Sequence, residues 1–175
     1  MIGFEDAFVN FVSDVTPAVW NLLWAVGAAT AFIWVSSMVV RLWRGTAVPG
    51  APTVAGGELV AVLVLSALIA NYAGTLHTLS HSIGLPDANF GPISYVSESS
   101  SLGKFAKVIN SAMTFAAMMG GIYGMKGLFL MHRQYSGEGN QGKDLFYKGF
   151  IHFISGGLLV QIAAVISGAA NSAAG

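Results

Sequence analysis

Four long apolar segments, separated by polar connectors, dominate the pattern of hydrophobic and polar positions along the chain. They run over residues 15–40, 59–86 (most apolar at 59–72), 105–131 and 149–168. The first of them contains no charged residue. Since a helix needs roughly 20 apolar residues to cross a bilayer, the pattern predicts four long helices of the membrane type.

The connectors predict how these helices are joined. Residues 45–57 are rich in glycine and proline, and residues 132–148 carry further glycines, so both are expected to be turns that return the chain directly. Each turn then joins two antiparallel neighbours. The predicted fold is all-α, with two tandem antiparallel helical hairpins at 15–74 and 105–175 and a connecting loop at 75–104.

The first residues form a separate predicted segment, 1–14. Apolar and acidic positions alternate there with roughly helical spacing, which suits a short amphipathic helix on a membrane or a neighbouring subunit. A polar start to the first membrane helix is an equally good interpretation. Because the acidic start lacks a basic n-region, it is not the pattern of a secretory signal peptide, and we expect insertion through the first apolar segment.

Composition strengthens the membrane assignment. The 175 residues are 54% hydrophobic and only 9% charged, where soluble domains carry roughly 25% charged residues. The net charge is zero, which argues against a broad surface for nucleic acid. The chain has no cysteine, so disulfides, thiolate metal sites and cysteine nucleophiles are excluded.

Basic residues gather around the two turns and predict the orientation. Under the positive-inside rule both turns face the cytoplasm, although Lys104 and Lys107 then lie on the other side. Lys126 lies inside the third apolar segment, where an ionisable residue is a functional candidate, although it is close enough to the helix end to reach the head groups. The candidate basic residues, facing a lumen, lipid head groups or DNA, are Arg41, Arg44, Lys126, Arg133, Lys143 and Lys148.

Glycines recur within the apolar segments, where they favour close contact between helices. The candidate packing positions are Gly27, Gly120, Gly121, Gly124, Gly156 and Gly157. The two halves share this plan of small-residue helix, basic end, turn and second helix, which suggests an internal duplication.

The sequence offers no pattern of enzymatic chemistry. It contains no nucleophile elbow, phosphate loop, HExxH motif or paired membrane carboxylates. His77 and His81 have the i, i+4 spacing of metal ligands, but we expect no carboxylate or cysteine near them to complete a site. We therefore expect neither an enzyme nor a metal site, and interpret the two histidines as a polar helix end.

The third and fourth segments resemble a known family. Residues 121–133 (GIYGMKGLFLMHR), a polar glycine-containing turn and residues 149–159 (GFIHFISGGLL) look like the small membrane subunits of type IVB secretion systems. These are the TraQ and TraR proteins of I-type conjugative plasmids and the related Dot/Icm proteins. The hairpin plan is also similar to the pilins of conjugative type IV secretion systems. That resemblance implies phospholipid packed between subunits and basic turns facing a lumen.

The resulting hypothesis is a structural, pilin-like subunit of a conjugative secretion machine, located in the bacterial inner membrane and assembled into an extracellular pilus. Its expected partners are copies of itself, phospholipid, other subunits of the machine and transiting single-stranded DNA. The alternatives are a static inner-membrane subunit of the same machine and a small channel or holin-like protein.

Overall fold

The computed structural model describes residues 3–97, 103–136 and 144–174. The described residues form six α-helices and no strand, and the chain is therefore all-helical. In chain order these are α1 (Phe4–Ala47), α2 (Gly56–Ala70), α3 (Tyr72–Ser82), α4 (Lys104–Tyr135), α5 (Asp144–Val160) and α6 (Ile162–Ala174).

The predicted N-terminal segment is not a separate helix, because α1 runs without a break from Phe4 to Ala47. Its buried positions continue across the expected boundary at residue 14 with spacings of three and four: Val12, Thr16, Trp20, Leu23, Gly27, Ala31, Trp34 and Met38. Such spacing keeps one face of the helix on its neighbour. Pro17 accordingly lies inside α1 and not in its first turn.

The other expected boundaries also shift. The first turn is shorter than 45–57, because α1 continues to Ala47 and α2 already begins at Gly56. Residues 75–82, assigned to the connecting loop, belong to α3.

The two returning segments are bent, where straight helices were expected. α2 and α3 meet at 96° around Asn71, and α5 and α6 meet at 79° around Gln161. Asn71 leaves the helical conformation, and its side-chain oxygen accepts a bond from the Gly74 N–H at 3.2 Å, which caps α3. Among the described residues, α1 and α4 are long and apolar enough to cross a membrane, and four spans result if each bent pair counts as one.

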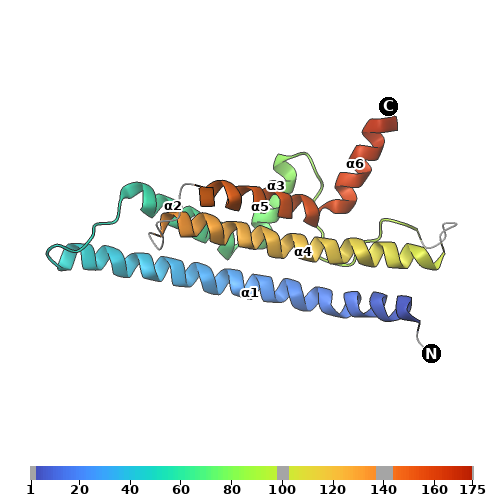
Figure 1. Ribbon diagram of the computed structural model, residues 1–175, viewed down its shortest axis with the longest axis horizontal. Coiled ribbons are helices and arrows are strands. Elements are labelled where there is room, and N and C mark those ends of the chain that lie inside the picture. The colour runs from blue at the N-terminus through green and yellow to red at the C-terminus, as the bar shows by residue number, and fades with distance from the viewer. Residues whose placement is uncertain (1–2, 98–102, 137–143, 175) are drawn as a thin grey trace.

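The two long helices lie side by side and run in the same direction (Figure 1). Trp20 near the start of α1 contacts Gly121, and Trp34 farther along α1 contacts Phe129 farther along α4. The ends of α1 and α4 and the starts of α2 and α5 therefore gather at one end of the molecule, which we call the basic end. α6 projects from the body near the other end (Figure 1).

The closest packing joins α4 to α5. A Cβ on Gly127 would lie 2.5 Å from the carbonyl oxygen of Gly149, and one on Gly120 would lie 2.7 Å from that of Gly156. Real side chains do not approach backbone so closely, so only glycine fits at these points. The remaining candidate glycines also lie at helix contacts: Gly27 on Ile69, Gly121 on Trp20, Gly124 on Tyr72, and Gly157 on Leu79.

Candidate functional site

An ion pair holds the basic end together. The guanidinium of Arg41, at the end of α1, pairs with the carboxylate of Glu58, at the start of α2. Another contact reaches the second hairpin, where an Arg41 Nη–H donates to the Ser136 carbonyl oxygen at 3.4 Å. The first hairpin is thus closed by a charge pair and joined to the end of α4.

A cavity of about 390 Å³ lies beside this pair, between α1 and α4. The indole of Trp34 stacks on the imidazole of His132 with ring centroids 3.7 Å apart and planes at 3°. The cavity lining combines these rings with hydroxyl and guanidinium groups: Ile33, Trp34, Ser37, Arg41, Phe129, His132, Arg133 and Ser136. The Oγ atom of Ser136 is buried without a hydrogen-bond partner among the described residues.

The structure brings together only some of the predicted basic residues. Arg41 and Arg133 share the cavity, whereas Arg44 and Lys148 are exposed near it, at the end of α1 and the start of α5. Lys126 lies apart from them on an exposed face of α4, with its Nζ atom 5.8 Å from the centre of the Tyr123 ring. Lys143 falls outside the described residues.

An apolar groove opens on the other side of the basic end. It has a volume of about 920 Å³ and runs between α2, the end of α4 and the start of α5. Its lining is aliphatic and aromatic apart from Glu58: Gly56, Gly57, Glu58, Val60, Ala61, Val64, Leu65, Leu68, Met131, Tyr135, Phe146, Phe150 and Phe153. An acyl chain has the chemistry to lie in this groove.

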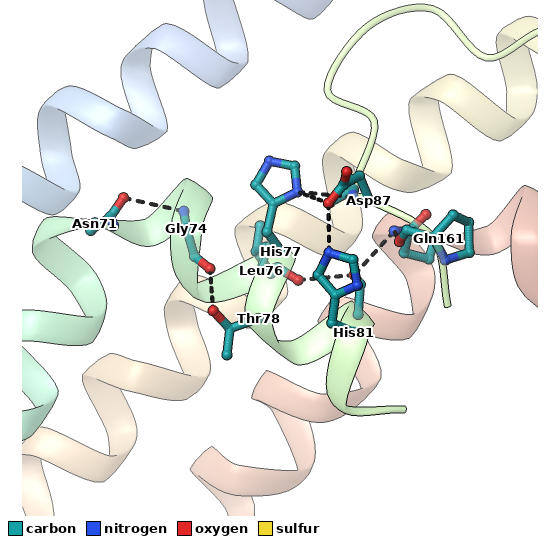
Figure 2. A network of polar contacts seen from close by, with 11 residues as sticks. Asn71, Gly74, Leu76, His77, Thr78, His81, Asp87 and Gln161 are labelled. Atoms are coloured by element: carbon teal, nitrogen blue, oxygen red, sulfur yellow. Dashed lines mark hydrogen bonds and ion pairs between the residues drawn. The ribbon is translucent and has the colours of Figure 1, made fainter. Parts of the chain in front are cut away.

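A second polar cluster lies toward the other end, around α3 (Figure 2). The expectation that no carboxylate stands near the histidines is wrong, because the following loop returns Asp87 to both of them. The Asp87 Oδ1 atom lies 2.8 Å from His81 Nε2 and 3.3 Å from His77 Nδ1. The His77 Nδ1 atom also accepts the Ala88 N–H at 3.2 Å, so it has no free lone pair for a metal. No group of three or more metal-ligating side chains in the described ranges is placed to hold an ion.

The loop carrying Asp87 is fastened to three helices. The Gln161 side chain, at the bend between α5 and α6, donates to the Ser80 hydroxyl at 3.0 Å and to the Pro86 carbonyl at 2.6 Å. On α4, Asn110 bonds the backbone at residues 95 and 96, and Thr114 accepts the Ile93 N–H. We call residues 83–97 the strap.

Aromatic rings complete the attachment of the strap. Phe90 contacts Trp20, Trp24 and His77 with centroids 4.8 Å, 5.0 Å and 5.2 Å away. Sequence reasoning missed this cluster. Its signals were the two histidines of residues 77–81, interpreted as a polar helix end, and the single amides Asn110 and Gln161 within otherwise apolar segments.

Comparison of the chain with protein-family models, with curated proteins and with solved structures found no match. The function of the chain is therefore inferred from its apolar helices, the basic end and the strap.

Proposed function

We propose that this protein is a structural, non-catalytic subunit of a conjugative type IV secretion machine, held in the bacterial inner membrane by its two bent hairpins. The observation that carries the membrane part is the pair of long apolar helices, α1 and α4, accompanied by two apolar bent pairs. The resemblance of residues 121–159 to type IVB membrane subunits supports the assignment to a secretion machine.

The outer surface suits contact with lipid or with further copies. Many large apolar side chains of α1 and α2 are exposed, outside the cavity and groove described above: Leu22, Val26, Phe32, Val39, Val40 and Leu63. Since a soluble monomer rarely exposes so large an apolar surface, copies of this chain and phospholipid are the proposed neighbours.

The pilin-like form of the proposal assembles copies of the subunit through these faces. The basic end then faces a lumen or lipid head groups, where its guanidinium and ammonium groups offset the phosphates of lipid or of transiting single-stranded DNA. Arg133 is the proposed centre of this surface, because Arg41 is already paired with Glu58.

The second candidate is a static inner-membrane subunit of the same machine. One observation favours it: the candidate glycines of α4 and α5 lie at contacts between helices of the same subunit. Few small-residue faces are then left for contact between copies. Large aliphatic side chains outside are typical of a surface that lies in lipid.

Charge reversal at the basic end tests the proposal. Replacing Arg133 and Lys143 with glutamate should lower plasmid transfer at least tenfold while membrane insertion stays normal, because the surface that offsets phosphate becomes repulsive. The measurements are mating frequency and the amount of protein in the inner-membrane fraction.

A charge swap provides the matched control. Arg41→Glu combined with Glu58→Arg keeps both the ion pair and the net charge, and should transfer at close to the wild-type frequency. Transfer unaffected by the Arg133 and Lys143 reversal would show that the charged-surface mechanism is wrong. Mass identification of the protein in sheared filaments, or only in membranes, then separates the pilin-like form from the static one.

A further inference from the structure

Four polar side chains share the outward face of the α4–α5 hairpin, away from the basic end. They are Tyr123 and Lys126 of α4 with His152 and Ser155 of α5, and we call them the polar stripe. Tyr123, Lys126 and Ser155 are exposed, and His152 is half-buried. Three of the four line a shallow depression of about 250 Å³. The stripe therefore puts hydrogen-bonding groups on a surface otherwise made of apolar side chains.

Lys126 lies toward Tyr123 along the helix and away from the basic end. Its Nζ atom lies 5.8 Å from the centre of the Tyr123 ring. Tyr123 is one turn closer to the start of α4, whereas the basic end lies beyond Tyr135. A lysine that reached the head groups would extend toward that end. In this conformation Lys126 lies beside the Tyr123 ring and does not extend toward the basic end.

The α5 members of the stripe have unused hydrogen-bonding capacity. The His152 Nδ1 atom lies 2.7 Å from the Lys148 carbonyl oxygen. Because a carbonyl only accepts, Nδ1 carries the hydrogen and the neutral ring leaves Nε2 as an acceptor. Ser167 and Ser172 bond the carbonyl four residues back, but Ser155 has no such bond in the part of the chain that the structure describes.

Within the described residues, the stripe makes contacts of its own but Lys126 forms no ion pair: its Nζ atom lies over the Tyr123 ring, whose centre is 6.2 Å from that of the His152 ring. α1 packs on another side of α4, where Trp20 contacts Gly121. A second copy has no acidic residue within its four apolar segments, and two of the acids that adjoin them, Glu58 and Asp87, lie against Arg41 and against the two histidines of α3. Ionisable side chains within membrane spans face either a partner or water.

We propose that the polar stripe lines a water-filled passage between copies of this chain, with Lys126 as a cationic group in its wall. The inference rests on the proposed function, which supplies the assembly of copies. Such a passage attracts anions, because a cation with apolar surroundings raises the local concentration of opposite charge.

Cysteine accessibility tests this directly, since the chain has no cysteine of its own. Ser155→Cys is compared with Val26→Cys, an exposed position on α1 at similar depth, because the neighbouring Gly27 lies against Met125. Both variants are treated in native membranes with an anionic, membrane-impermeant methanethiosulfonate. Thiols react as thiolates, which form in water and not in hydrocarbon.

The cysteine at 155 is expected to react at least tenfold faster than the one at 26. Tyr123→Cys should behave like Ser155→Cys and provides a second position. The comparison is made in protein that has reached the membrane. If the thiols at 155 and 123 react there as slowly as the thiol at 26, the polar stripe does not line a water-filled passage. The structural-subunit proposal would survive that result, because membrane location and transfer are measured separately.

The charge of Lys126 gives the second arm. In the Ser155→Cys protein, an anionic reagent should react faster than a cationic one of the same size. Lys126→Gln should reduce this preference about threefold or more, because it removes the positive charge beside the thiol. If Lys126→Gln leaves the preference for the anionic reagent unchanged, Lys126 is not a cationic group in the wall of the passage.

Discussion

At the scale of single residues, the fold depends on glycines that face backbone. Gly127 and Gly149 lie against each other across α4 and α5, and a Cβ on either would meet the carbonyl oxygen of the other at 2.5–2.6 Å. Backbone cannot move aside as a flexible side chain does, so a methyl group at this point must separate the two helices. The packing of α4 on α5 thus depends on two residues that have no side chain.

Gly127→Ala is accordingly expected to destabilise the protein by about 1–3 kcal/mol, the usual range for overpacking. Thermal unfolding of the purified protein in detergent, followed by circular dichroism, measures the effect. Gly168→Ala is the matched control, because a Cβ at that position of α6 meets nothing within 4 Å. Equal stability of the two variants would contradict the packing described for α4 and α5.

At the scale of elements, a single amide joins the start of the strap to the α5–α6 bend. Gln161 is 5% exposed and donates to both Ser80 and Pro86, so it joins the α5–α6 bend to the end of α3 and the start of the strap. An apolar residue of similar volume would remove the part-buried hydrogen bond to the Pro86 carbonyl, and such a bond contributes about 0.5–1.5 kcal/mol.

Gln161→Leu should therefore loosen the start of the strap, residues 83–88, while Asn110 and Thr114 still hold its later part on α4. Hydrogen exchange by mass spectrometry is expected to show faster exchange in peptides covering residues 83–88 and unchanged exchange in α4. Ser172→Ala, which removes a hydroxyl bonded only within α6, is the control. Uniform acceleration in both regions would mean that Gln161 supports the whole fold and not the strap.

The apolar runs predicted the helices well, because a helix position is apolar both where it faces hydrocarbon and where it faces the core. The bends at Asn71 and Gln161 were not predicted, since one polar residue in an apolar run does not distinguish a break from a tolerated amide. The proximity of Asp87 to the histidines depends on how the strap returns, which no local pattern encodes. The pattern at 2–14 was compatible with a separate helix or with the start of the first membrane helix. The structure shows the second, because α1 is continuous from Phe4 to Ala47.

At the scale of the whole molecule, the parallel arrangement of α1 and α4 fixes the orientation of both halves together. Because Trp20 meets Gly121 and Trp34 meets Phe129, the two hairpins cannot insert in opposite directions without separating the long helices. The basic residues of both turns then favour the same orientation of the whole molecule under the positive-inside rule. With the bent pair α2–α3 counted as one span, the strap lies on the opposite side of the membrane from residues 48–55.

Single cysteines at exposed positions measure this orientation. Val48→Cys, between α1 and α2, should react with an impermeant maleimide only after the inner membrane is permeabilised, whereas Ser94→Cys, in the strap, should react in intact spheroplasts. The two sites serve as controls for each other, because one thiol on each side shows that the reagent and the membrane behave as intended. Labelling of both thiols in intact spheroplasts would mean that the bent pair α2–α3 does not cross the membrane as one span.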